Sequence, residues 1–332
     1  MLDPTPRPSL RTWQPTPTAA LVAVLASAAL YALVPAFARP LTGAGVPAVE
    51  VAFARVLVPA LALVGSIDLR PGRRRATAWG LASGAAIGVG GAAHVHVLEV
   101  GAVGSAAIAS MAAPLAAMGA AAALFRRRPS RRAVGAGALV VAAAVIGLGP
   151  TGGAAWTPWV LVAPVTFGFS IAVLTERLGT LDVLARTATV CAGATIGLAP
   201  LLARPGSGAV VPRGWSLVAL VGCGLVGALV PMILYGAGAP TLGAAGASLV
   251  GSAELPLTFA VAALALGEST TIGQLGAALL IGVAVLVGST DPARIGPAAH
   301  GAAARRATVA PRGRARWPAP SATARPVSRP RP

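Results

Sequence analysis

Glu254 is the residue whose position most clearly suggests chemistry. It lies near the middle of an otherwise uncharged stretch, residues 241–266, two positions before Pro256. Proline has no backbone N–H to donate, so a carbonyl group one turn earlier, near Ser252, is left free. Glu254, Ser252 and the freed backbone would form a polar notch in apolar surroundings, where a carboxyl group could take up and release a proton. The alternative is a glutamate that is neutralised by protonation or by a structural ion pair.

Arg55 is the second charged residue deep inside an apolar stretch, residues 46–67. Its planar guanidinium group could bind a substrate carboxylate, or it could pair with Glu254 or Glu50. A purely structural ion pair is an equally open interpretation. Glu50 lies nearer the end of the stretch, and we expect it at a membrane interface.

Three further side chains could line the same site. His94 could lie at a cavity mouth and titrate near physiological pH, or it could only form interfacial hydrogen bonds. His94 and His96 are two positions apart and point to different faces of a helix, so we predict no metal site. Tyr31 and Tyr235 are polar-tipped aromatic residues that could either contact a solute or pack.

Several prolines interrupt the apolar stretches, and we predict kinks or hinges at Pro114, Pro231 and Pro256. The two cysteines, Cys191 and Cys223, lie in separate stretches without ligand spacing and are expected to be small packing residues. The chain contains no G-x-S-x-G sequence, no phosphate-binding Gly-Lys loop and no Cys/His cluster. We therefore predict no enzymatic activity and no cofactor.

All of these residues lie on segments that are long enough to cross a bilayer, which requires roughly 20 residues of helix. About ten segments qualify: residues 19–38, 46–67, 76–98, 103–125, 133–150, 157–175, 183–203, 215–238, 241–266 and 272–289. The chain is 56% hydrophobic and 11% charged, whereas a soluble domain carries roughly 25% charged residues. The predicted fold class is an all-α integral membrane protein with about ten transmembrane helices.

The net charge of +17 would suggest nucleic-acid binding if it were not so unevenly placed. With the N-terminus on the cytoplasmic side, 22 of the 26 arginines fall on that side, including Arg177, Arg186 and the groups at 70–75, 126–132 and beyond 290. Only three fall on the other side. This asymmetry is the positive-inside bias, so we predict a multi-pass protein of the cytoplasmic membrane with both termini in the cytoplasm and no nucleic-acid partner.

The sequence also repeats itself at a shift of 142 residues, later 141. The matches include Gly101 with Gly243, Ser110 with Ser252, Pro114-Leu115 with Pro256-Leu257, and Gly147 with Gly288. Each half contains about five apolar segments, and an odd number means that the second half enters the membrane from the opposite side. The repeat therefore predicts two inverted five-helix repeats, an architecture typical of secondary transporters.

This organisation divides the chain into four parts. Residues 1–18 form a cytoplasmic N-terminal tail, 19–150 the first repeat, and 157–290 the second repeat. Residues 291–332 are rich in Pro, Ala and Arg, and we expect a disordered basic cytoplasmic tail. The tail and the arginine-rich loops could attract anionic lipids, or the tail could be solvated and only reinforce orientation.

The segment from Ser248 to Val287, SLVGSAELPLTFAVAALALGESTTIGQLGAALLIGVAVLV, resembles the end of an EamA domain of the drug/metabolite transporter superfamily. Such domains show a small-residue run, a mid-helix proline, an apolar stretch, Leu-Gly-Glu, a polar link and a Gly-spaced final helix. The first half has the same layout around Pro114 but has Leu124-Phe125-Arg126 in place of Leu-Gly-Glu. Pro47 and Arg55 are similar to a proline and an arginine of the family's second helix.

The resemblance implies ten helices in two inverted repeats around a central cavity, with the fifth and tenth helices outside it. It also implies movement of small metabolites or drugs, often outward and in exchange for protons. We therefore expect a secondary transporter that exports a small organic solute such as a metabolite, amino acid or drug. A homodimer is left open. The alternatives are a membrane sensor or scaffold that uses its basic tail, and a lipid enzyme built around His94, His96 and Glu99.

Overall fold

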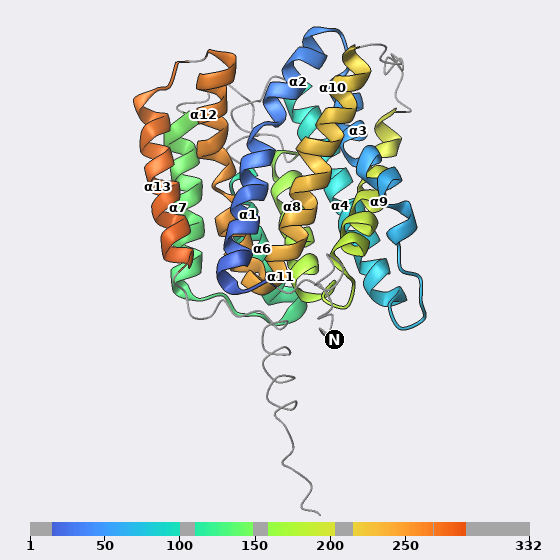
Figure 1. Cartoon of the computed structure of the whole chain (residues 1–332). Helices are drawn as coiled ribbons and strands as arrows, with labels where there is room; N and C mark the ends of the chain where they lie inside the picture. Colours follow the sequence, from blue (N-terminus) through green and yellow to red (C-terminus); the bar gives the residue numbers. More distant parts are fainter. Residues whose placement is uncertain (1–14, 100–109, 149–158, 203–214, 268, 290–332) are drawn as a thin grey trace, which may run out of the picture.

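The computed structural model describes residues 15–99, 110–148, 159–202, 215–267 and 269–289, and these residues are helical without strands (Figure 1). A short 3₁₀ helix, Val64–Ser66, follows α3, and a π-helix, Leu225–Leu229, joins α10 to α11. The α-helices are α1 (Pro17–Ala32), α2 (Val34–Gly43), α3 (Ala48–Ala62), α4 (Arg74–Glu99), α6 (Ala113–Phe125), α7 (Arg131–Leu148), α8 (Trp159–Glu176), α9 (Val183–Leu202), α10 (Trp215–Gly224), α11 (Val230–Gly251), α12 (Glu254–Leu266) and α13 (Ile272–Ser289).

Four helical segments are long and apolar enough to cross a membrane: Pro17–Gly43, Trp159–Glu176, Val183–Leu202 and Leu217–Ala265. Two shorter apolar helices, Ala113–Phe125 and Ile272–Gly288, accompany them. Large apolar side chains such as Leu264, Ile272 and Leu279 are exposed on the surface, as expected where a helix faces lipid rather than water. The fold is therefore that of a helical membrane protein, while the count of ten crossings stays a prediction.

The two halves of the chain are interleaved rather than separate. The most extensive helix contacts join α4 to α9 and α8, α1 to α11, and α7 to α13. Glycines allow the α4–α9 approach, because a Cβ atom on Gly84 or Gly193 would overlap a backbone carbonyl of the opposite helix. Small residues serve this purpose in membranes, where lipid supplies no hydrophobic drive for helix association.

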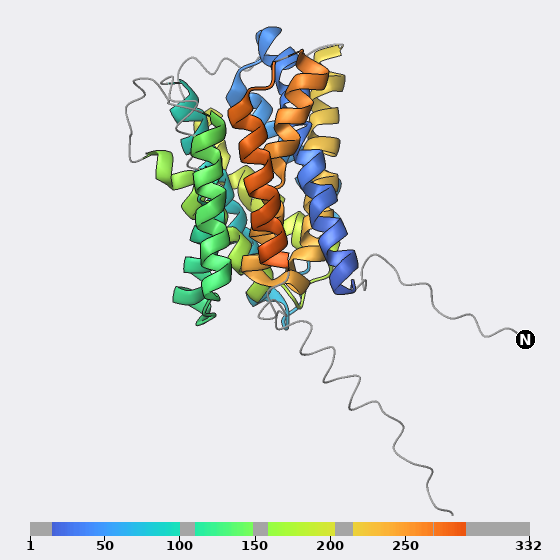
Figure 2. The same cartoon turned by 90° about the vertical axis from the view of Figure 1, so that its left-hand side faces the viewer.

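The connections between helices lie at two ends of the bundle (Figures 1 and 2). The start of α1, the end of α13 and the α3–α4, α6–α7 and α8–α9 connections lie at the lower end in Figure 1, whereas the α12–α13 connection lies at the upper end. The arginine-rich segments 70–75 and 126–132 are thus at the same end as both described ends of the chain. Because α7 leaves the lower end and α13 leaves the upper end, these two packed helices are antiparallel.

The last two helices of each half have matching bounds. The helices α6 and α12 both contain 13 residues, and α7 and α13 both contain 18. Each 13-residue helix ends at a residue in the left-handed conformation, Arg126 with φ 57° and Gly267 with φ 69°. Glycine adopts this conformation without strain, so the second half carries the residue type that helix ends favour.

One predicted boundary is wrong. The apolar pattern predicts the link between the eighth and ninth segments at residues 239–240, but α11 continues through Pro240 and the backbone turns at Gly243 (φ 71°, ψ 172°). Only glycine adopts that φ without a steric cost, and this is what locates the turn. The first segment is also divided, because α1 ends before Leu33 and α2 begins with Pro35 in its first turn.

Some predicted features lie outside the described residues: most of the N-terminal tail, the boundary between the halves at 150–157, Gly101, the side chain of Glu99 and the tail 291–332. Within the described residues, Cys191 and Cys223 are free and buried, which confirms their prediction as packing residues.

Candidate functional site

A partly open cavity of about 510 Å³ lies among the helices, and it brings the predicted site residues together. Its lining includes all six of them: Tyr31, Arg55, His94, Tyr235, Ser252 and Glu254. The wall is formed by α1, α3, α4, α6, α8, α9, α11 and α12, and no described lining residue comes from α7 or α13. This agrees with the expectation that the fifth and tenth helices lie outside the cavity.

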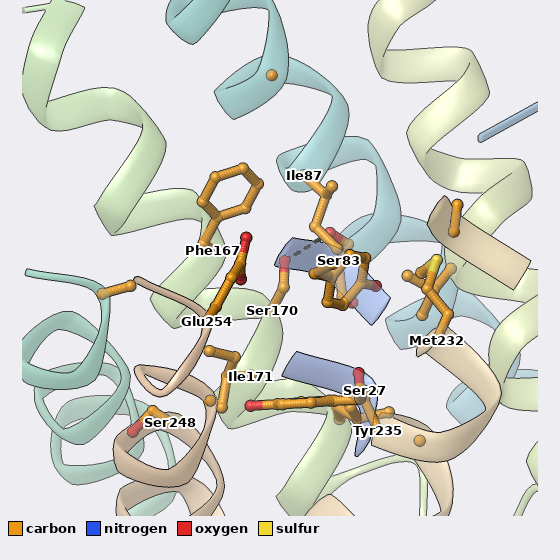
Figure 3. A pocket seen from close by; sticks show the side chains of 18 of the residues that line it. Ser27, Ser83, Ile87, Phe167, Ser170, Ile171, Met232, Tyr235, Ser248 and Glu254 are labelled. Carbon is orange, nitrogen blue, oxygen red and sulfur yellow. Dashed lines mark hydrogen bonds between the residues drawn. The ribbon is translucent and has the colours of Figure 1, made fainter. Parts of the chain in front are cut away.

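Glu254 is the first residue of α12, directly after the two-residue turn Ser252-Ala253 that separates α12 from α11. The position is favourable for a carboxylate because the N-terminus of a helix carries partial positive charge. In Figure 3 its side chain extends into the pocket between the labelled side chains of Phe167 and Ser170. Among the described residues, no hydrogen bond or ion pair engages the Glu254 carboxylate, so it is free to bind a proton or a ligand.

Arg55 is held by a carbonyl group that a proline has freed. Pro231 has no N–H to donate to Gly227, and the guanidinium Nη2 of Arg55 donates to that Gly227 carbonyl instead, at 3.1 Å. Its Nε is buried and has no hydrogen-bond partner. Arg55 forms no ion pair with Glu254 or Glu50 in the part of the chain that the structure describes. The pairing alternatives are therefore absent from this conformation, and an unused N–H remains at the cavity wall.

The remaining polar groups of the cavity divide into two classes. The hydroxyl groups of Ser27, Ser170 and Ser252 donate to the carbonyl oxygens of Pro231 (2.8 Å), Ser83 (2.7 Å) and Ser248 (3.1 Å). In contrast, Ser83 Oγ and the Tyr235 hydroxyl group are buried without a partner. Buried polar groups are usually hydrogen-bonded. Three of the four unpartnered buried atoms among the described side chains belong to cavity residues, which is the pattern expected of a site that binds a polar ligand.

The predicted hinge prolines are placed differently from one another. Pro114 lines the cavity beside Met111 and Ser110, whereas Pro231 and Pro256 do not line it and act on the backbone. A two-residue turn precedes both α6 and α12, so Pro114 and Pro256 each follow a helix break closely. The hinge role of these prolines stays a prediction.

His94 lines the cavity, whereas His96 packs edge-on against Trp159, with ring centroids 5.9 Å apart. The two histidines thus have different environments, as their spacing predicted. No group of three or more His, Cys, Asp or Glu side chains that could hold a metal ion occurs among the described residues.

Sequence reasoning missed Ser83, Phe167 and Arg186, which also line the cavity. Arg186 was counted with the cytoplasmic arginines, yet its guanidinium group is in the cavity wall and donates to several carbonyl oxygens. A signal was present, because Arg186 lies three residues inside the segment 183–203. Ser83 and Phe167 offer no comparable signal, since serine and phenylalanine are common on any face of a membrane helix.

A known protein family matches the second part of the chain. Residues 154–290 match the model of the EamA-like transporter family. An EamA family domain therefore lies at residues 154–290. This confirms the resemblance seen in the sequence and is consistent with an EamA transporter of the drug/metabolite transporter superfamily. No curated protein sequence matches the chain.

Solved structures support the fold over most of the chain, with 21 matching chains. One of them, a crystal structure titled only as that of a protein, has 18% sequence identity and a TM-score of 0.64. The match covers 82% of this chain and 98% of that chain. At this identity the likeness shows a shared fold, which extends beyond the family match into the first half of the chain.

Proposed function

We propose that this EamA-domain protein is a secondary transporter that moves a small organic solute across the cytoplasmic membrane. The observation that carries the proposal is the cavity, which is lined by the helices of the bundle and holds an unpaired carboxylate and an arginine with an unused N–H. Its volume of about 510 Å³ is in the range of pockets that bind small molecules. Such a site suits a solute with one or two polar groups on an apolar body.

Alternating access between two inverted repeats is the proposed mechanism. The matched lengths of α6 and α12 and of α7 and α13 support an internal repeat, and the antiparallel pairing of α7 with α13 supports its inversion. Helices broken at the level of the binding site are common in transporters of this kind. The turns before α6 and α12 match that pattern.

Glu254 is the proposed coupling residue. Its carboxyl group has no competing partner among the described residues, so it can accept a proton from one side of the membrane and release it to the other. Arg55 is the proposed contact for a negatively polarised group of the solute, because a buried arginine N–H without a partner favours an anionic or carbonyl acceptor. We infer that the transporter exports its solute in exchange for protons.

We infer the orientation from charge. The arginine-rich connections and both described chain ends lie at the same end of the bundle, and the positive-inside rule supports a cytoplasmic location for that end. We infer that the arginines of these connections and of the tail also contact anionic lipids. A homodimer is compatible with the exposed apolar helix faces.

Purified protein in liposomes tests the proposal. A thermal-shift screen against metabolite pools first identifies a stabilising solute, because a bound ligand stabilises the folded state by mass action. Proton-driven flux of that solute is then compared between wild type, Glu254→Gln and the control Glu50→Gln, which changes an acid that does not line the cavity. The proposal predicts that flux coupled to protons is lost in Glu254→Gln and kept in Glu50→Gln. If solute flux is coupled to protons equally in all three proteins, Glu254 is not the coupling residue.

The second candidate function is a sensor or scaffold that acts through its basic tail. The 42 residues from 291 to 332 contain nine arginines, which could bind a partner. This candidate predicts that solute flux is absent and that deletion of the tail abolishes function. The transport proposal predicts that the deletion leaves flux in place.

A further inference from the structure

The cavity is closed at the end that faces the arginine-rich connections. Ile87, Leu174 and Met232 belong to its lining and also pack against a buried cluster below it. That cluster includes Leu178 and Leu181 of the α8–α9 connection, whose exposed fractions are 0% and 1%. Apolar side chains thus lie between the cavity and the α8–α9 connection, together with Arg186, which lines the cavity and donates to carbonyl groups of that connection.

Aromatic and cationic side chains from the two halves of the chain meet at this end. Trp79 of α4 and Phe125 of α6 come from the first half, and Trp79 packs against Phe125 and against Phe169 of α8, with centroid distances of 6.1 and 6.4 Å. The guanidinium carbon of Arg177, from the second half, lies 4.9 Å from the Phe125 ring centroid and 6.0 Å from that of Trp79. A cation over an aromatic face is attracted by the negative charge of the ring face.

An ion pair crosses the same boundary. Arg127, directly after α6, donates through Nε to a carboxylate oxygen of Glu176 at the end of α8, at 3.0 Å. The Glu176 side chain is only 8% exposed, whereas that of Arg127 is 53% exposed. The pair therefore caps the aromatic layer at the water-facing edge and is partly shielded from solvent.

Arg186 fixes the segment that carries Arg177. Its Nε donates to the carbonyl oxygens of Leu178 (2.8 Å) and Leu181 (2.9 Å), and its Nη1 donates to Gly236 of α11 (2.9 Å). All these partners belong to the second half. Arg186 thus joins the α8–α9 connection to α11 by hydrogen bonds. Arg177 and Glu176 of this joined region contact α4 and the end of α6 of the other half.

We propose that Arg177 and the Arg127–Glu176 pair form a gate between the halves at the arginine-rich end, with Arg186 as its positioning residue. The inference rests on the proposed alternating-access function. To open the cavity toward this end, the two halves must separate at Arg177–Trp79–Phe125 and at Arg127–Glu176. Arg127 and Arg177, which belong to the positive charge that orients the chain in the membrane, therefore also set how often the cavity opens toward the arginine-rich end.

The gate can be tested without a known solute, by labelling from one side of the membrane. The reporter is Ser83→Cys, a cavity position with 0% exposure, in a background with Cys191→Ala and Cys223→Ala. A membrane-impermeant maleimide is applied to vesicles from the arginine-rich side, which is identified separately by labelling Arg132→Cys. The rate of reporter labelling is compared between the parent and gate variants.

Weakening the gate should raise the labelling rate from this side. Arg177→Ala should raise it roughly fivefold, within the range of about 2- to 30-fold that one cation–π contact allows. Arg127→Glu and Glu176→Arg should each raise the labelling rate, because each variant places two like charges at positions 127 and 176. The double variant, which swaps the two charges, should return the labelling rate to within about twofold of the parent. Arg128→Ala, which removes an exposed arginine of the same connection, should leave the rate unchanged.

Two results would overturn the proposal: Arg177→Ala labelled no faster than Arg128→Ala, or a charge swap as fast as the single variants. A misfolded variant is recognised because it labels equally from both sides and is not rescued by the swap. If labelling behaves as expected but no solute flux is ever found, the gate stands and the transport function fails. If flux is found but the gate variants label like the parent, the gate fails alone.

Discussion

Gly88→Ala tests the packing of α4 on α9, which builds one wall of the cavity. A Cβ atom on Gly88 would lie 2.5 Å from the carbonyl oxygen of Ala194 and 2.8 Å from the Cα and C atoms of Gly197. All three atoms are backbone, so no flexible side chain can move aside. Carbon and oxygen approach to about 3.3 Å at closest, so α4 and α9 would have to separate by roughly 0.8 Å.

The expected change in the free energy of unfolding follows from two opposing effects. Forcing extra atoms into a well-packed core costs about 1–3 kcal/mol, and the rigid surroundings of Gly88 place it near the upper end. Alanine is a better helix former than glycine by about 1 kcal/mol. The net result is a loss of roughly 2 kcal/mol for Gly88→Ala.

Gly135→Ala in α7 is the matched control. No atom lies within 4 Å of the position its Cβ would take, so only the helix-propensity gain of up to about 1 kcal/mol applies. The two variants should therefore differ by about 3 kcal/mol, or on the order of 5 °C in melting temperature. The assay is the loss of monodisperse protein on heating in detergent. If the two variants melt within about 1 °C of each other, the close α4–α9 approach is wrong.

Three further predictions concern the site and the tail. Arg55→Met should raise the KM for the solute roughly tenfold or more, because a charge-assisted hydrogen bond to the solute is lost, and Arg55→Lys should restore part of the lost affinity. The KM is measured from the dependence of flux on solute concentration, and an unchanged KM in Arg55→Met would exclude the contact. Ser27→Ala should lower the free energy of unfolding by about 1 kcal/mol, because the buried Pro231 carbonyl loses its donor, and thermal unfolding in detergent would contradict this if no loss appears. Deletion of residues 291–332 should leave flux in liposomes within about twofold of wild type, whereas complete loss would favour the sensor or scaffold function.

The cavity residues could be predicted from sequence because charged and polar side chains inside apolar segments are costly unless they face a cavity or a partner. That argument selected Glu254 and Arg55, and His94 was a candidate for the cavity mouth because it can titrate near physiological pH; all three line the cavity. The same argument applies to Arg186, which lies inside an apolar segment but was assigned to the cytoplasmic charges and therefore not considered as a cavity residue. The segment around Leu-Gly-Glu also predicted that the family match would lie in the second half of the chain.

The partners of these residues could not be predicted, because they depend on how helices far apart in sequence are placed. The sequence offers Glu254 and Glu50 as partners for Arg55, yet the structure supplies the Gly227 carbonyl. In hindsight the signal is Pro231, which leaves that carbonyl without its helical donor. The turn at Gly243 was similarly hidden, because neighbouring glycines and Pro240 offered other positions for the same break.

Proton movement driven by the solute tests the central claim most directly. Liposomes containing the protein and a trapped pH-sensitive dye are supplied with the solute, without any imposed proton gradient. The account predicts that wild type moves protons opposite to the solute and that Glu254→Gln carries solute without protons or not at all. A wild-type protein that moves solute with no change in internal pH, or a Glu254→Gln variant that still moves protons, would contradict it.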